Sequence, residues 1–282
     1  MGLGGYLCWT AVAREVNKIN PGLKCMPVEL YNNGSILKTI KSEIFLNNSS
    51  LYQEWEHDVY SFPLVLNNPQ SNYCKKDTPE KAVHRYDKHI IEQYCETFGI
   101  ENPELKCVIN LTEEENEKVN DLISDISFEF VTINTDVNKE YTSNKFENFE
   151  FWQKVVDSMP HLKFVQIGLK GKNLKNAIDL TGKTTFREAA GIISRSKCFV
   201  GSEGGLVHAA TAFDVPSLVM ITSFIHPDLV SYPGNTNIWM NKDGHGPCGM
   251  KHYCQKCHDN MSHISVEYVC QQINKILEVK NG

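Results

Sequence analysis

One short run of residues limits what this chain can fold into more than any other. The run occupies residues 200–210 and reads V-G-S-E-G-G-L-V-H-A-A. It follows an apolar segment typical of a strand, residues 197–200, and opens a helix that ends before Val215-Pro216. A second apolar strand follows over residues 217–221. A strand, a glycine turn, a helix and another strand form a βαβ unit, which predicts a parallel sheet.

The same run predicts a binding site for phosphate. Backbone N–H groups at the start of a helix, together with the helix dipole, attract anions. Gly204 and Gly205 would let the backbone approach a ligand that a Cβ would exclude, and Glu203 and His208 lie within two turns of it. The alternative is an ordinary strand-to-helix turn with a capping glutamate and a core histidine, because glycine turns of this kind are common.

Length, charge and cysteine usage narrow the class of protein. A chain of 282 residues suits two compact α/β lobes, and its net charge of −6 argues against a nucleic-acid-binding surface. No stretch has the length and apolarity of a membrane span, and the first residues do not read as a secretory signal. We therefore expect a cytoplasmic protein whose ten scattered cysteines are reduced thiols.

The first half of the chain has the weaker pattern. Residues 2–5 form a glycine turn that opens a helix, and the periodicity also predicts a strand over residues 23–30 and a helix over residues 82–98. A glycine turn that feeds a helix normally follows a strand, so we expect that a first strand is missing ahead of it.

The second half, from residue 127, alternates strands and helices more clearly. Thr185 and Glu188 have the spacing of a capping box at the start of one of these helices. The whole pattern predicts an α/β protein of two Rossmann-like lobes with parallel sheets and a ligand cleft between them. The expected lobes are residues 1–125 and residues 126–282.

Several further segments, read in order, point to one family. Residues 145–149 read K-F-E-N-F, residues 179–190 read D-L-T-G-K-T-T-F-R-E-A-A, and Y-P-G follows at residues 232–234. With the glycine run, they resemble the donor-lobe motifs of the ADP-heptose:lipopolysaccharide heptosyltransferases, glycosyltransferase family nine. The N-terminal G-L-G-G-Y-L, with Thr10, is similar to the family's G-x-G-D-x-L-x-x-T. The resemblance is weakest over residues 25–125.

The resemblance implies a GT-B architecture, with an acceptor-binding lobe first and a nucleotide-sugar-binding lobe second. It implies inverting transfer of heptose or a related sugar from a nucleotide diphosphate, ADP-heptose above all, without a metal in the chemistry. The implied acceptor is lipopolysaccharide, capsule or another cell-surface glycan or glycolipid, reached at the inner face of the inner membrane through peripheral membrane contact. The positions carried over to donor binding are Thr135, Lys145, Thr184, Glu203, Gly204, Gly205 and His208.

The chain departs from the family at the position of the catalytic base. The aspartate of the N-terminal motif, which would take the proton of the acceptor hydroxyl, is replaced by Gly5. Another acidic group of the first lobe, such as Glu56 or Asp58, could serve instead, or the alignment could slip at this end. The remaining alternative is a catalytically weak or inactive paralogue that binds nucleotide sugars.

A group of cysteines follows the donor motif. Cys254-x-x-Cys257 has metal-ligand spacing, and Cys248 and Cys270 could complete a tetrahedral set, with His252 and His258 as further donors. The resemblance adds that some relatives that modify autotransporters bind iron through such a cluster. The candidates are a structural Zn or Fe site, reduced thiols that pack a loop, or a disulfide. A zinc hydrolase is the weakest interpretation, because the chain lacks the His-x-Glu that pairs a base with the metal.

Overall fold

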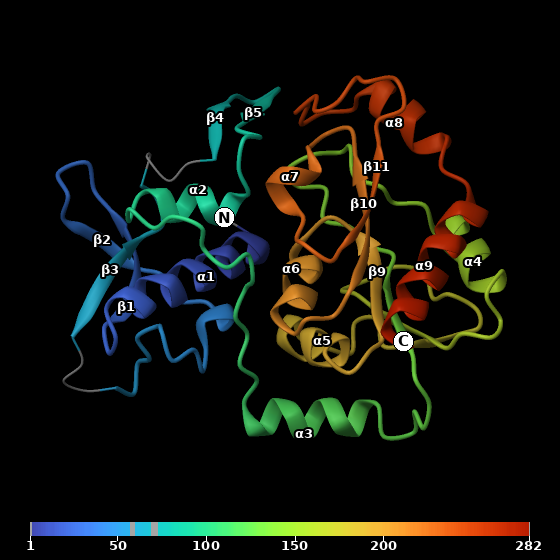
Figure 1. Cartoon of the computed structure of the whole chain (residues 1–282), viewed down its shortest axis with the longest axis horizontal. Coiled ribbons are helices and arrows are strands. Elements are labelled where there is room, and N and C mark those ends of the chain that lie inside the picture. The colour runs from blue at the N-terminus through green and yellow to red at the C-terminus, as the bar shows by residue number, and fades with distance from the viewer. Residues whose placement is uncertain (1, 57–59, 69–72, 282) are drawn as a thin grey trace.

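The described chain starts with a long helix. A computed structural model of the protein describes residues 2–56, 60–68 and 73–281 (Figure 1). Helix α1 (Leu3–Ile19) buries an apolar face that includes Leu7, Trp9 and Val12. It ends at Ile19 with Asn20 as its C-cap, and Gly22 follows with a φ of +87°, which favours glycine.

A small mixed sheet follows α1. Strands β1 (Lys24–Leu30), β2 (Ile36–Thr39) and β3 (Ser61–Val65) lie in the order β2-β1-β3. β1 pairs parallel with β3 but antiparallel with β2, so this sheet is not wholly parallel as the sequence suggested. The reason is the short connection around Gly34 between β1 and β2, since so short a turn can join only antiparallel strands. The 3₁₀ turn η1 (Glu43–Phe45) lies between β2 and β3.

The helix expected over residues 82–98 is partly wrong. Its first residues form strand β5 (Ala82–His84), which pairs antiparallel with β4 (Cys74–Asp77). Only its second part is helical, as α2 (Ile90–Glu96), which begins at a capping box formed by His89 and Glu92. Helix α3 (Glu113–Leu122) then crosses toward the second half.

A six-stranded sheet organises the second half, and all of its pairings are parallel, as the sequence predicted. Its order is β11-β10-β9-β6-β7-β8. From β6 the chain adds β7 and β8 on one side, and from β9 it adds β10 and β11 on the other side. The strands are β6 (Val131–Asn134), β7 (Phe164–Ile167), β8 (Ala177–Asp179), β9 (Cys198–Ser202), β10 (Ser217–Thr222) and β11 (Thr236–Met240).

Helices cover both faces of this sheet and create two cores. One core lies between the sheet and the helices α4 (Phe149–Asp157) and α9 (Val266–Asn281), around Trp152 and Ile273. The other continues through α5 (Phe186–Ile193) and α6 (Gly205–Ala212) into α1 and α2, so the two halves of the chain share it. Figure 1 shows α1 beside α6. The other helices described in the second half are α7 (Pro227–Val230) and α8 (Gln255–Ser262).

A buried arginine reinforces the contact between the halves. Arg187 on α5 is 1% exposed, and its guanidinium forms an ion pair with Glu115 on α3. It also donates to the Asn110 carbonyl at 2.7 Å. The predicted capping box of Thr185 and Glu188, which starts this helix, is present. Among the described residues, no helix is both long and apolar enough to cross a bilayer.

Candidate functional site

The predicted donor residues gather where the strand order of the large sheet changes direction. Thr135 follows the carboxyl end of β6, and Glu203 follows that of β9, which is the neighbouring strand. In open α/β sheets, ligands bind outside the carboxyl ends of the strands at this kind of switch point. A cavity lined by Phe130, Lys163 and Leu277 lies near the opposite, amino-terminal ends of β6 and β7 and includes none of the predicted donor residues.

Lys145 and Glu203 form the centre of the site. The Lys145 ammonium lies 3.1 Å from Glu203 Oε2 and donates to the Glu203 carbonyl at 3.2 Å. Both side chains are about one-fifth exposed. Burial acts to raise the pKa of Glu203, but the charge and hydrogen bond of Lys145 outweigh it and lower the pKa below its usual value. Glu203 is therefore a carboxylate near neutral pH, paired with an ammonium that remains partly open to solvent.

The backbone on either side of Lys145 is fixed to the ends of two strands. Thr222, at the end of β10, donates to the Asn144 carbonyl at 2.6 Å. Ser202, at the end of β9, donates to the Phe146 carbonyl at 2.7 Å, and the Phe146 ring is buried. Because both neighbours are held, the path of the chain directs the lysine toward the glycine turn.

The helix after the glycine turn starts without a side-chain cap. Gly204 occupies the N-cap position of α6 and no side chain bonds to the first amides. The Val207 amide bonds back to the Gly204 carbonyl at 3.1 Å, whereas the Gly205 and Leu206 amides precede the first intrahelical bonds, so a ligand can use them. A Cβ on Gly205 would lie 3.1 Å from the Phe186 ring and 3.5 Å from the Gly4 nitrogen, so this turn is closely surrounded.

His208 faces the first half of the chain. Its Nδ1 lies 2.5 Å from the Tyr232 hydroxyl and 3.9 Å from the Cys8 thiol on α1. Burial lowers the pKa of His208 to about 4, despite the opposing charge of Glu203. A neutral imidazole in these contacts ties α6 to Tyr232 and to α1 of the first half.

The two threonines come from different loops, Thr135 from the one after β6 and Thr184 from the one before α5. Thr135 is buried and accepts a hydrogen bond from Gln166 Nε2 at 3.2 Å. Thr184 is half-buried just before α5, two residues from Phe186, whose ring meets the Gly205 turn. The structure therefore brings the predicted donor positions to one end of the sheet.

The start of α1 has no carboxylate of its own at the position of the absent aspartate. The first turn of α1 contains no acidic residue, and Gly4 packs there against His208. Glu56 is engaged elsewhere: it forms an ion pair with Lys24 and accepts from the Gln53 amide at 2.9 Å. Partial desolvation raises the pKa of Glu56, but these hydrogen bonds lower it overall. Asp58 lies outside the described residues.

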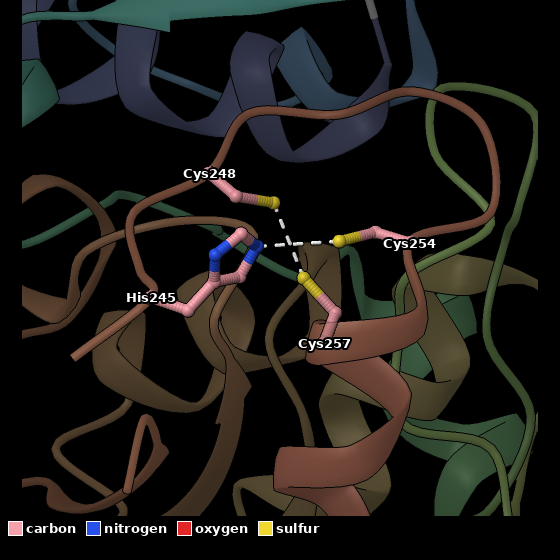
Figure 2. Close-up of side chains that lie close together, drawn as sticks. All are labelled: His245, Cys248, Cys254 and Cys257. Carbon is pink, nitrogen blue, oxygen red and sulfur yellow. Dashed lines mark hydrogen bonds between the residues drawn. The ribbon is translucent and has the colours of Figure 1, made fainter. Parts of the chain in front are cut away.

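Residues 245–257, the cysteine loop, bring four possible metal ligands together. This set differs by one residue from the predicted set of metal ligands. Figure 2 shows His245, Cys248, Cys254 and Cys257 converging, with donor atoms all within 4.8 Å of one another. Cys270 is not part of this group. It lies on α9, where its thiol meets the Val155 carbonyl of α4 at 3.9 Å, because the helix carries it into the α4–α9 contact.

These four residues fit a tetrahedral metal ion. The Sγ atoms of Cys248 and Cys257 are 3.1 Å apart, and His245 Nε2 is 3.2 Å from the Cys254 Sγ. Ligands around a tetrahedral zinc lie roughly 3.3–3.8 Å from one another, and three cysteines with one histidine are a common structural zinc set. The missed sequence signal is the spacing His245-x-x-Cys248, which precedes Cys254-x-x-Cys257 and supplies the fourth ligand.

A comparison with known protein families finds one match, in the second half of the chain. The model of glycosyltransferase family 9 (heptosyltransferase) matches residues 162–258. This match includes Thr184, the glycine turn, His208 and the cysteine loop, whereas Thr135 and Lys145 precede it. The predicted resemblance to this family is confirmed. No curated protein sequence matches the chain.

Solved structures of low sequence identity share the fold. A glycosyltransferase family 9 protein from Veillonella parvula superposes with a TM-score of 0.69 at 14% identity, covering 98% of this chain and 94% of that one. Escherichia coli heptosyltransferase WaaC with ADP gives 0.56 at 12% identity, covering 98% and 97%. The iron-containing dodecameric glycosyltransferase TibC from enterotoxigenic E. coli gives 0.63 at 14% identity, covering 99% and 74%. The predicted α/β GT-B fold is confirmed.

Proposed function

Starting from a glycosyltransferase family 9 segment on a GT-B fold, we propose that this chain is an inverting glycosyltransferase. It transfers heptose or a related sugar from a nucleotide diphosphate, with ADP-heptose as the expected donor. The observation that carries the proposal is the contact of Lys145 with the Glu203 turn, at the mouth of an uncapped helix and at the switch point of the sheet. Structural relatives are described in complex with ADP or ADP-D-β-D-heptose, which supports the donor class.

The chemistry of transfer explains why these groups lie together. When the glycosidic bond of the donor breaks, negative charge grows on the departing diphosphate. The amides at the start of α6 and the Lys145 ammonium then stabilise that charge. Glu203 holds the ammonium in place before the donor arrives, and the lysine can keep its bond to the Glu203 carbonyl while it turns toward a phosphate oxygen.

The transfer itself proceeds without a metal in this proposal. A zinc or iron ion held by the cysteine loop would cross-link residues 245–257 and supply stability rather than chemistry. The iron in TibC supports such a site, as does the fit of the four donor atoms.

The acceptor and the location follow from the same assignment. We place acceptor binding in residues 1–125 and donor binding in residues 126–282. The acceptor is lipopolysaccharide, capsule or another cell-surface glycan, met by peripheral contact at the cytoplasmic face of the inner membrane. A relative described as an ADP-heptose lipopolysaccharide heptosyltransferase supports this class of acceptor.

One observation favours a second candidate function. Because the first turn of α1 lacks a carboxylate, the chain could bind a nucleotide sugar without transferring it. Incubation of the purified protein with ADP-heptose and a lipopolysaccharide-core acceptor separates the two functions by the release of ADP. Turnover that is lost in Lys145→Ala and Glu203→Ala supports the enzyme. Saturable donor binding without any release of ADP supports the binder. If the protein neither binds ADP-heptose nor releases ADP, both functions are excluded.

A further inference from the structure

The segment that precedes Lys145 is hydrogen-bonded along the cysteine loop. Thr142 Oγ1 donates to the Met250 carbonyl at 2.9 Å, and the Ser143 amide donates to the Lys251 carbonyl at 3.0 Å. These contacts join residues that are more than 100 positions apart in the sequence. They bring the loop that holds the four metal-ligand candidates against the strip of chain that carries the donor lysine.

Asn144 makes the closest part of this contact. Its side chain is fully buried. Its Nδ2 donates to the Met250 carbonyl at 2.6 Å and to the His252 carbonyl at 2.7 Å, and its Oδ1 accepts from the Cys254 amide at 2.9 Å. Both ends of the amide are therefore used. The next residue is Lys145, and the Asn144 carbonyl is bound by Thr222.

The groups that Asn144 binds lie between two metal-ligand candidates. Met250 and His252 are located between Cys248 and Cys254, and the third contact is the amide of Cys254 itself. Ligation at both ends of so short a segment would reduce the number of conformations open to it. Without ligation, the carbonyls that Asn144 binds are fixed less firmly, and so is the lysine next to it.

We propose that Asn144 is a positioning residue that couples metal occupancy of the cysteine loop to the placement of Lys145 at the diphosphate site. This inference rests on the proposed donor role of Lys145. Metal binding at the loop then strengthens binding of a nucleoside diphosphate, although the two sites share no ligand. By linkage, the diphosphate strengthens metal binding by the same factor.

The test measures the dissociation constant of ADP by calorimetry, for chelator-stripped, reduced protein and for protein loaded with Zn²⁺. In the wild type, zinc is expected to tighten ADP binding by at least about 5-fold, the lower end of typical allosteric coupling. In Asn144→Ala, the ratio of the ADP dissociation constants of stripped and zinc-loaded protein should fall to about one, while the variant still binds one equivalent of zinc. A Co²⁺-loaded sample, with its thiolate-to-cobalt absorption, verifies that the ligand set is intact in the variant.

Asn260→Ala is the matched control. Asn260 is also a buried amide beside the loop, where it donates to Asp243 at 2.7 Å and to Ser223 at 3.2 Å, so its hydrogen bonds do not involve residues 142–146. This variant should keep the wild-type ratio. If the metal-free protein does not hold its fold, zinc-loaded Asn144→Ala must bind ADP at least about 5-fold more weakly than zinc-loaded Asn260→Ala.

The outcomes separate this inference from the proposed function. If ADP binds tightly but independently of zinc in the wild type, or if Asn144→Ala keeps the ratio, the coupling is refuted and the donor site stands. If the two loaded variants bind ADP equally, the coupling is refuted as well. If the wild type binds no ADP in either form, both the coupling and the proposed donor site are refuted.

Discussion

At the scale of single residues, the donor site depends on a charged pair that is only partly desolvated. Lys145 and Glu203 are 58 positions apart in the sequence, yet each is the other's closest opposite charge in the site. A single charge at one-fifth exposure would be costly if it were left alone, so each residue requires the other. The pair is therefore assembled before any ligand arrives.

Replacing the lysine tests its role directly. In Lys145→Ala we expect ADP to bind roughly 10- to 100-fold more weakly, because a charge-assisted hydrogen bond contributes about 1.5–3 kcal/mol. Calorimetric titration with ADP measures the change. Lys139→Ala is the control, since Lys139 also pairs with a glutamate, Glu147 at 2.5 Å, but on the surface. Equal affinities of the two variants would contradict the assignment.

At the scale of elements, the start of α1 meets the start of α6 through glycines. A Cβ on Gly4 would lie 2.9 Å from the His208 ring and 3.3 Å from the Gly205 Cα. The backbones of the two helices approach so closely because side chains are absent there. The N-terminal G-x-G-G run thus serves a packing contact between the two halves of the chain.

Gly4→Ala is expected to destabilise the protein by about 1–2 kcal/mol, because the clash exceeds the helix-propensity gain of alanine. Denaturant unfolding at neutral pH measures the loss. Gly2→Ala is the control, because a Cβ at Gly2 would meet nothing within 4 Å. A Gly4→Ala protein as stable as Gly2→Ala would show that the two helix starts are not packed in this way.

A second prediction at this scale concerns the metal content of the cysteine loop. Protein purified under reducing conditions should contain about one equivalent of Zn or Fe, as one tetrahedral set of four ligands requires. Cys248→Ser and His245→Ala should lose this metal, whereas Cys270→Ser should retain it, since Cys270 lies in the α4–α9 contact. Elemental analysis decides, and metal below a tenth of an equivalent in the wild type would exclude the site.

At the scale of the whole molecule, the two halves share one apolar core that also contains buried histidines. His84 and His208 are both less than a tenth exposed, and burial lowers the pKa of each to about 4. Their unfolded pKa is about 6.5, so the unfolded chain binds protons between about pH 6.5 and 4 that the folded chain does not bind. The stability contributed by the neutral imidazoles is therefore lost as the pH falls through this window.

We expect His208→Gln to reduce the acid sensitivity of the fold. Between pH 7 and pH 4.5, protonation of His208 in the unfolded chain should cost the wild type about 2 kcal/mol of its free energy of unfolding. Glutamine does not bind a proton, so the variant should not lose this amount. Denaturant unfolding at the two pH values measures the difference. The exposed His161→Gln is the control. If both variants lose as much stability as the wild type, His208 does not carry this effect.

Features that depend on local pattern could be predicted from the sequence alone. Alternation of apolar strands and capped helices predicted the parallel sheet of the second half, and Thr185 with Glu188 predicted the start of α5. The glycine run marked the end of β9 and the start of α6, because glycines at such a turn have a local physical reason. The first half was predicted less well, since propensity did not separate β5 from α2.

Which distant residues meet could be seen only in the folded chain. The contact of Lys145 with Glu203, the choice of His245 over Cys270, and the buried amide of Asn144 all depend on how strands and loops return to one place. A side chain's neighbours across the fold are set by strand order and helix packing, which local spacing does not encode. The sequence therefore named candidate residues, whereas the fold set their arrangement and added His245.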